Sequence, residues 1–309
     1  MAEKREIGSS GIEISPLALG GNVFGWTADE ATSFTLLDAF VDAGGTMIDT
    51  ADVYSAWVEG HVGGESETVI GKWLARSGKR EDVVIATKVG MMAGLAADTV
   101  ASACDASLKR LGTDRIDLYY LHKDDENTPL AETLGAYDAL VRAGKVRAIG
   151  LSNFTAARVD EAMRVCEEHG FARPQALQPW YNLVERARFE DELEGAAKRA
   201  GLSVFPYYGI ANGFLAGKYR STEDLGKSAR GMRNIAYLEG KGQRVLAAMD
   251  EIAADTGAAL ASIALAWLMR RITAPIASAT SLAQLAELTA AMELTLSDEQ
   301  VATLDAASS

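Results

Sequence analysis

The chain has 309 residues, and its 43 Asp and Glu against 30 Lys and Arg leave a net charge of −13. Hydrophobic residues make up 48% of it, enough to bury a core and too many for a disordered chain. Nucleic acids and anionic membrane surfaces are therefore not expected partners, because both attract basic faces.

The first residues, MAEKREIG, lack the apolar run of a signal peptide, and no apolar stretch is long enough to span a bilayer. We therefore expect a cytoplasmic protein in which Cys104 and Cys166 are reduced core thiols. No His or Cys spacing is typical of a structural metal site, so no metal is expected.

In chain order, REIG and GIEIS flank a Ser9-Ser10-Gly11 turn signal, which predicts a short β-hairpin. Eight short apolar or β-branched runs then predict buried strands at 17–21, 46–50, 83–88, 116–122, 146–152, 176–182, 202–208 and 274–280. Amphipathic patterns between the first of them predict helices at 29–43, 66–76, 98–111 and 129–142.

Most of these strands begin roughly 30 residues apart, the spacing of a (β/α)₈ barrel. The first strand is followed by LGGNVFGW, which lacks the G-x-G-x-x-G spacing of a Rossmann fold. The sequence therefore predicts an α/β protein with one (β/α)₈ TIM-barrel domain over residues 1–309, preceded by the hairpin. Between strands seven and eight we expect a long loop, 209–242, followed by helices at 243–256 and 258–271. A barrel needs one helix in this interval, so one of the two is an addition.

Chemically capable side chains gather where the expected strands end, the edge at which barrels place their active sites. Asp49, Lys88 and His122 close strands two to four, and Tyr54 follows in the loop after Asp49. An Asp49–Lys88 ion pair would keep an ammonium beside the phenol of Tyr54 and favour release of its proton. Each residue alone also has a structural explanation, such as a helix cap, a surface lysine or loop packing.

Four segments in order, GTMIDTADVYS, IATKVG, LYYLHKDD and AIGLSNF, resemble the aldo-keto reductase superfamily, and QPWYNLVER and GFLAGKYR extend the likeness. It covers about residues 7–304 and is strongest to the branch of bacterial proteins similar to potassium-channel β subunits. The resemblance implies an NADP(H)-dependent oxidoreductase that interconverts aldehydes or ketones, sugar carbonyls among them, and alcohols. It also implies the catalytic tetrad Asp49, Tyr54, Lys88 and His122, with Tyr54 as the proton donor.

The same resemblance implies cofactor contacts along the second half of the chain. The nicotinamide end would meet Ser152, Asn153, Gln178, Tyr207, Tyr208 and Ile210. The phosphates would meet Gly213, Leu215, Gly217 and Lys218, and the adenosine end Ser278, Thr280, Gln284 and Glu287.

Two departures from the family pattern stand out. Tyr208-Gly209-Ile210 replaces a common Ser-Pro-Leu, and the segment SATSLAQLAEL has no Lys or Arg for a 2′-phosphate. NAD(H) therefore stays open as an alternative cofactor, and Ser281 in that segment has a plain reading as a helix cap.

A basic stretch within the long loop, KYRSTEDLGKSARGMR, has five cations and two acids in a chain that is otherwise acidic. It predicts either a solvated polar loop or a cationic flap over the cofactor phosphates, with Lys218 and Arg230 as the best candidates.

Aromatic residues in the top loops predict a rim for the substrate, a small-molecule carbonyl compound or alcohol. The candidates are Asn22, Phe24, Trp26, Trp57 and Trp180. Packing between loops is the alternative role for the tryptophans.

Two other functions remain open from the sequence. A Schiff-base aldolase would use Lys88 as its amine, although Asp49 would hold that amine protonated. A cofactor-binding sensor or subunit with little turnover would retain the same tetrad. Neither the physiological substrate nor the oligomeric state is indicated.

Overall fold

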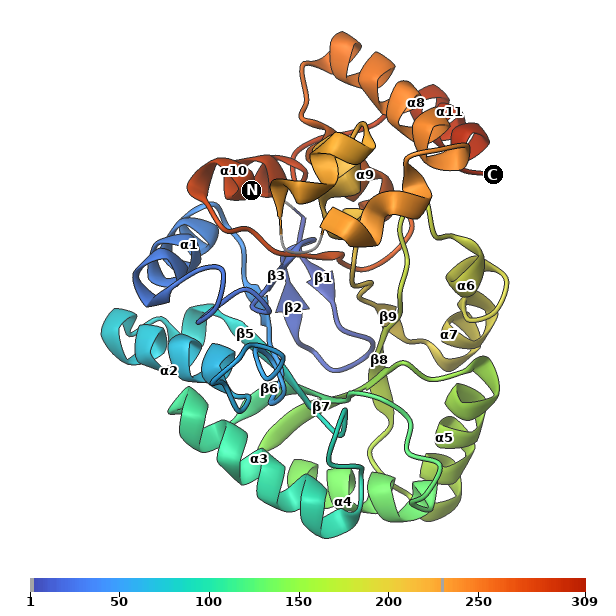
Figure 1. The fold of residues 1–309 in the computed structure, drawn as a ribbon. Coiled ribbons are helices and arrows are strands. Elements are labelled where there is room, and N and C mark those ends of the chain that lie inside the picture. The colour runs from blue at the N-terminus through green and yellow to red at the C-terminus, as the bar shows by residue number, and fades with distance from the viewer. Residues whose placement is uncertain (1–2, 229–230) are drawn as a thin grey trace.

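The computed structural model describes residues 3–228 and 231–309. A parallel sheet of eight strands, in the order β10-β3-β4-β5-β6-β7-β8-β9, forms the centre of the molecule (Figure 1). These strands are β3 (Ala18–Gly20), β4 (Met47–Asp49), β5 (Val84–Val89), β6 (Ile116–Leu121), β7 (Val146–Ser152), β8 (Pro174–Gln178), β9 (Ser203–Val204) and β10 (Ile276–Ala277). The amide of Ile276 donates to the carbonyl oxygen of Pro206 at 2.9 Å, which links the segments at the two ends of the sheet. The predicted (β/α)₈ barrel is confirmed.

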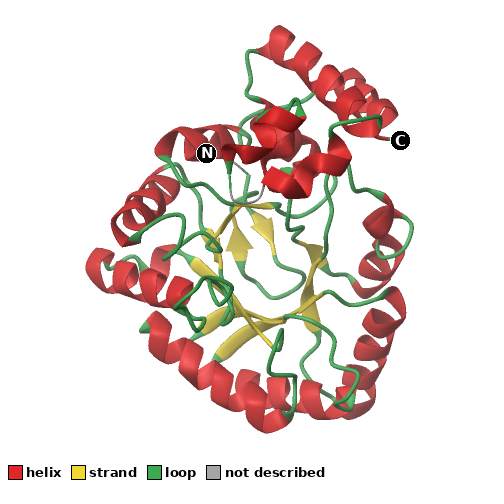
Figure 2. Ribbon diagram, viewed as in Figure 1, coloured by secondary structure: helices red, strands yellow, loops and turns green. Residues whose placement is uncertain are grey.

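Helices surround the strands as an outer ring (Figure 2). They are α1 (Glu30–Asp42), α2 (Glu65–Ser77), α3 (Ala97–Leu111), α4 (Leu130–Arg142), α5 (Ala156–His169), α6 (Ala187–Glu190), α7 (Glu194–Ala200), α8 (Lys241–Thr256), α9 (Leu260–Met269), α10 (Leu282–Ala290) and α11 (Asp298–Ser308). The sequence signals locate the ends of these helices well. The Asp29 carboxylate caps α1 by accepting from the amide of Thr32, and Gly112 ends α3 with a φ of 62°.

Apolar side chains form two layers, one between strands and helices and one inside the barrel. The antiparallel hairpin of β1 (Arg5–Glu6) and β2 (Glu13–Ile14) contributes Ile7, Ile12 and Ile14 to the inner layer. These isoleucines share that layer with Ala18 and Met47, the first residues of β3 and β4. The predicted hairpin therefore closes the barrel at the N-terminal ends of the strands, opposite the edge where Asp49 ends β4.

The interval between β9 and β10 is more regular than the predicted loop 209–242. It contains the 3₁₀ helices η2 (Ala211–Ala216), η3 (Thr222–Lys227) and η4 (Gly231–Tyr237), and a further one, η1 (Arg80–Asp82), precedes β5. Such short helices leave no repeating apolar pattern in a sequence, so periodicity does not reveal them. The two helices expected next are present as α8 and α9.

No single helix in residues 3–228 or 231–309 is long and apolar enough to cross a membrane. The pair α8 and α9 satisfies the criterion only together, across a bend of 99°.

Candidate active site

The barrel register brings three of the four predicted catalytic residues to one interior edge. Asp49 on β4 pairs with Ala86 on β5, and Lys88 on β5 pairs with Tyr120 on β6. Side chains two residues apart on a strand share a face, so Lys88 lies one step above Ala86 and His122 one step above Tyr120. Since Ala86 and Tyr120 face the barrel interior, Asp49, Lys88 and His122 do so as well.

Tyr54 completes the cluster from the loop after β4. The Lys88 ammonium donates to Asp49 Oδ1 at 2.6 Å, to the Thr50 carbonyl at 2.7 Å and to the Tyr54 hydroxyl oxygen at 2.9 Å. The Tyr54 hydroxyl donates in turn to Asp49 Oδ1 at 3.2 Å. Lys88 and Asp49 are almost fully buried, so this ion pair is shielded from solvent.

Burial governs the protonation of this cluster. It lowers the pKa of Lys88, while the charge of Asp49 acts in the opposite direction. Burial, and secondly the charge of Lys88, hold the pKa of His122 well below its ordinary value. His122 is therefore a neutral imidazole near neutral pH, able to donate one hydrogen bond without adding charge.

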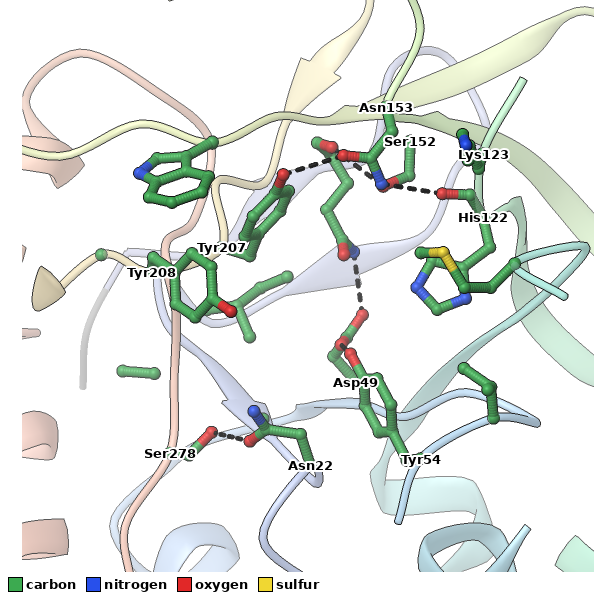
Figure 3. Close-up of a pocket in the computed structure, with 18 of the residues that line it drawn as sticks. Asn22, Asp49, Tyr54, His122, Lys123, Ser152, Asn153, Tyr207, Tyr208 and Ser278 are labelled. Carbon is green, nitrogen blue, oxygen red and sulfur yellow. Dashed lines mark hydrogen bonds between the residues drawn. The ribbon is translucent and has the colours of Figure 1, made fainter. Parts of the chain in front are cut away.

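A cavity of about 830 Å³ opens above this cluster. Figure 3 shows Asp49 and Tyr54 at one end of it, Tyr207 and Tyr208 on one side, and His122 and Lys123 on the other. The predicted site residues that line the cavity are Asn22, Asp49, Tyr54, Trp57, His122, Ser152, Asn153, Gln178, Trp180, Tyr207, Tyr208, Ile210 and Ser278. The volume is that of a pocket for a small organic ligand.

Four of the residues predicted at the nicotinamide end form one hydrogen-bonded network, in which Asn153 Nδ2 donates to the Ser152 hydroxyl oxygen at 3.1 Å. Gln178 Nε2 donates to Asp49 Oδ2 at 2.9 Å, and the Ser152 hydroxyl donates to the Gln178 carbonyl at 3.0 Å. Asn153 Nδ2 donates to the His122 carbonyl at 2.8 Å, and Asn153 Oδ1 accepts from the Tyr207 hydroxyl at 2.8 Å. This hydrogen-bonded network holds amide and hydroxyl groups from the ends of β7 and β8 and from the segment after β9 next to Asp49 and His122.

Strained backbone and orphaned polar atoms mark the same cavity. Ser55, Asn153, Tyr208, Ala211 and Asn212 have positive φ without being glycine. Asn153, Tyr208 and Asn212 line the cavity, and Ser55 and Ala211 are each next in sequence to residues that do. Such strain concentrates at binding sites. Among the described residues that line the cavity, His122 Nδ1, Trp180 Nε1 and Asn212 Oδ1 are buried without a hydrogen-bond partner. Donors and acceptors left in this way fit a polar ligand such as a nicotinamide nucleotide.

Other predicted cofactor residues lie outside this cavity. Leu215 is fully buried in η2, between Gly213 and Gly217, and the Lys218 ammonium lies over the Tyr219 ring. These residues belong to the interval after β9, and none of Gly213, Leu215, Gly217 and Lys218 lines the cavity.

At the expected adenosine end, Gln284 and Glu287 are exposed on α10. Gln284 Oε1 accepts from the Thr280 amide at 2.9 Å. The Ser281 side chain caps the N-terminus of α10, the structural role that the sequence also allowed for this residue.

The basic stretch is only partly available to phosphates. Arg220 forms an ion pair with Asp250, Lys227 one with Asp224, and Arg233 donates to the Tyr208 hydroxyl. Arg230, one of the two best candidates, lies outside the described residues, so its role stays a prediction.

The aromatic rim differs from its expected form. Phe24 is fully buried in the outer apolar layer and does not line the cavity. The rings of Trp26 and Trp57 pack in a T-shaped arrangement with their centroids 5.6 Å apart. The sequence reasoning missed Val53, Met91, Met92 and Lys123, which do line it. Met91 and Lys123 follow β5 and β6 closely, so the strand-end rule that selected Lys88 and His122 also applies to them.

A second buried charge cluster lies on the outer face of β5, directly behind the tetrad. Glu67 on α2 accepts from the Thr87 hydroxyl at 2.5 Å and from Arg110 Nε at 2.6 Å. Asp52, two residues before Tyr54, has a buried Oδ1 without a partner among the described residues. Burial and then the charge of Glu67 raise the pKa of Asp52 to about 6, and Arg110 opposes this.

This shift predicts a pH-dependent cost of folding. An unfolded Asp titrates near pKa 3.9, so the folded state binds the Asp52 proton more tightly. The contribution of Asp52 to stability is thus fully present below about pH 4 and is lost as pH rises through about 6, a cost of about 2–3 kcal/mol. We expect Asp52→Asn to have the higher free energy of unfolding at pH 8, by roughly that amount, with the advantage vanishing near pH 4.

Urea denaturation at both pH values measures this difference. Glu59→Gln removes an equal charge from an exposed position in the same loop and is the matched control. Equal stabilities of Asp52→Asn and the parent chain at pH 8 would contradict the prediction.

Comparison with known proteins agrees with this geometry. Residues 16–309 match the model of the aldo/keto reductase family. The chain is 36% identical over 309 residues to an uncharacterized oxidoreductase, YrpG, of Bacillus subtilis, covering 95% of this chain and 92% of that protein. It is 32% identical to norsolorinic acid reductase stcV of Emericella nidulans, over 94% of this chain and 78% of that protein. It is also 38% identical to human aflatoxin B1 aldehyde reductase member 4, over 69% of this chain and 63% of that protein. With a barrel that carries its charged cluster at the strand ends and a family match over nearly its whole length, the chain belongs to the aldo-keto reductase family.

Proposed function

We propose that the chain is an NADP(H)-dependent oxidoreductase that interconverts an aldehyde or ketone and the corresponding alcohol, with Tyr54 as the proton donor. The observation that carries this proposal is the Tyr54 hydroxyl, bonded to both Lys88 and Asp49 at the end of the cavity. Membership of the aldo-keto reductase family supports the reaction class.

The residues of the chain divide the work of proton transfer. Tyr54 would turn its O–H from Asp49 to the substrate carbonyl oxygen, while Lys88 continues to donate to the phenol oxygen and stabilises the phenolate that forms. Neutral His122 would donate a hydrogen bond to the same carbonyl oxygen. Asp49 keeps Lys88 charged and in place.

A bound reduced nicotinamide would supply the hydride to the carbonyl carbon, so that one hydride and one proton convert the carbonyl to an alcohol. In the chain, Ser152, Asn153 and Gln178 would hold the carboxamide, and Tyr207 would stack on the ring so that only one face is open to substrate. Solvent would return the proton to Tyr54. In the reverse direction Tyr54 would accept the proton from the alcohol.

The choice of NADP(H) over NAD(H) rests on the family resemblance. The segment 278–288 has no cation, and an exposed Glu287 lies one turn from Gln284. The remaining source of positive charge is the basic stretch after β9. A test must therefore include NAD(H).

The geometry favours neither alternative function by a specific contact. For an aldolase, Lys88 would need a free amine exposed to the cavity, yet its ammonium donates to three acceptors and is fully buried. For a sensor with little turnover, the cavity would hold cofactor alone.

One experiment tests the proposal and separates it from a sensor. A panel of aldehydes, ketones and sugars is incubated with the enzyme and NADPH, and in parallel with NADH, while loss of the reduced cofactor is followed by absorbance. We expect turnover of several aldehydes, faster with NADPH. Tight cofactor binding without turnover on any member of the panel would contradict a reductase and support a sensor.

A further inference from the structure

The cavity contains one side chain whose charge is not matched by a neighbour. Its charged lining residues are Asp49 and Lys123. Asp49 is neutralised by Lys88 at 2.6 Å and also accepts from Gln178. Lys123 is exposed, and no carboxylate of residues 3–228 or 231–309 forms an ion pair with its ammonium.

The three residues after Lys123 are acidic, so the sequence suggests local neutralisation. The fold directs the carboxylates of Asp124 and Asp125 elsewhere, and Glu126 is exposed and forms no ion pair with Lys123. Asp124 accepts two hydrogen bonds from Arg158, each 2.8 Å long. Asp125 accepts from the Leu95 amide and from the Thr128 hydroxyl, both at 2.8 Å. Neither carboxylate therefore pairs with the ammonium of Lys123, which stays available to a ligand.

The position of Lys123 associates it with the reacting end of the cavity. It follows His122 directly, and consecutive Cα atoms are about 3.8 Å apart. The His122 ring lies edge-on to the Tyr54 ring, with centroids 6.2 Å apart. In Figure 3, Lys123 lies beside His122, across the cavity from Tyr207 and Tyr208. Since Tyr207 is the residue expected to stack on the nicotinamide, Lys123 is on the substrate side.

The wall around this ammonium is apolar and open. Trp57, Met91 and Met92 line the same cavity and are 51%, 38% and 79% exposed. Methionine is unbranched and adapts to ligands of varied shape, and large exposed apolar side chains at a cavity indicate a binding surface. This half of the cavity thus offers apolar contact and a single positive charge.

We propose that Lys123 is a specificity-determining residue that selects carbonyl substrates carrying a carboxylate a few bonds from the reacting carbon. The hydrophobic body of the substrate would contact Trp57, Met91 and Met92, and its carboxylate would accept a charge-assisted hydrogen bond from Lys123. A chain with a net charge of −13 repels anions at long range, so a local cation is what retains such a substrate. This inference rests on the proposed carbonyl reductase function.

The test compares acids with their neutral esters on the complete enzyme. The para and meta carboxybenzaldehydes and their methyl esters are reduced with saturating NADPH, and kcat/KM is measured for each. We expect Lys123→Met to lower the acid-to-ester ratio of kcat/KM by at least about tenfold, through KM more than kcat. Lys123→Arg, which keeps the charge, is expected to retain the ratio of the parent enzyme within about threefold.

Salt gives a second readout that a structural role would not move. Raising the ionic strength toward about 1 M shortens the screening length to about 3 Å, so the ratio should fall in the parent enzyme and stay constant in Lys123→Met. Lys109→Met, an exposed position on α3, is the matched control and should keep both the ratio and its salt dependence.

The outcomes separate the two levels of the proposal. Ester reduction with an acid-to-ester ratio that Lys123→Met leaves unaltered would overturn the role of Lys123 while the reductase function stands. Failure of the parent enzyme to reduce either acid or ester, with NADPH or NADH, would overturn both.

Discussion

Tyr54→Phe is expected to lower kcat for aldehyde reduction by roughly 10²–10⁴-fold, the range attributed to general acid catalysis by a positioned side chain. The substitution removes only the hydroxyl that lies 2.9 Å from the Lys88 ammonium and 3.2 Å from Asp49 Oδ1. The ring stays to fill its place, and Lys88 keeps its bonds to Asp49 and Thr50. Cofactor affinity, measured by fluorescence titration, should therefore change little.

Loss of an unrelated phenol hydroxyl controls for general damage. Tyr137→Phe removes a buried hydroxyl that donates to the Tyr120 carbonyl at 3.0 Å, in the outer layer of the barrel. We expect it to cost stability and leave kcat within about twofold. Full turnover by Tyr54→Phe would rule out Tyr54 as the proton donor and require another acid in the cavity.

The clustering of the predicted catalytic residues at one edge of the barrel was predictable because it depends on local rules that act one strand at a time. Asp49, Lys88 and His122 each end a recognisable apolar run, and parallel strands bring their C-terminal ends to one edge. The strand-to-strand register then decides which of them meet. Asp49 and Lys88 come into contact because β4 pairs with β5 so that Asp49 faces Ala86, a detail that no single segment contains.

Loop conformation is where the sequence reasoning fell short. Phe24 is aromatic and follows β3, so the sequence predicts it at the rim of the cavity. The chain instead turns back after β3, where the Phe24 amide donates to the Gly21 carbonyl, and the Phe24 ring packs in the outer apolar layer. Lys123 precedes three acidic residues, which suggests a neutralised side chain, yet Arg158, thirty-four residues away from Asp124, binds the first of them. The Glu67 cluster joins α2, β5 and α3 through contacts that no periodicity encodes.

Lys88→Met is expected to lower both the free energy of unfolding of the protein and its activity. Asp49 is 1% exposed, and without the ammonium its charge would be buried with the Gln178 amide and the Tyr54 hydroxyl as its side-chain donors among the described residues. Removing one partner of a buried ion pair costs about 3–5 kcal/mol, and we expect the free energy of unfolding in urea to fall by that amount. Activity should fall at least as far as in Tyr54→Phe, because the phenolate loses its neighbouring cation.

The double substitution Asp49→Asn with Lys88→Met separates the two effects. Both charges are then absent, so the desolvation penalty disappears, and replacing a whole buried pair by neutral groups is often close to neutral for stability. We expect the double variant to recover at least half of the stability that Lys88→Met loses, and to remain as inactive as that variant. Recovery of turnover together with stability would mean that the ion pair only supports the fold and that Tyr54 needs no ammonium to release its proton. Low activity in a stable double variant would instead assign the pair a direct part in proton transfer, since stability and catalysis would then respond to different properties of the same two side chains.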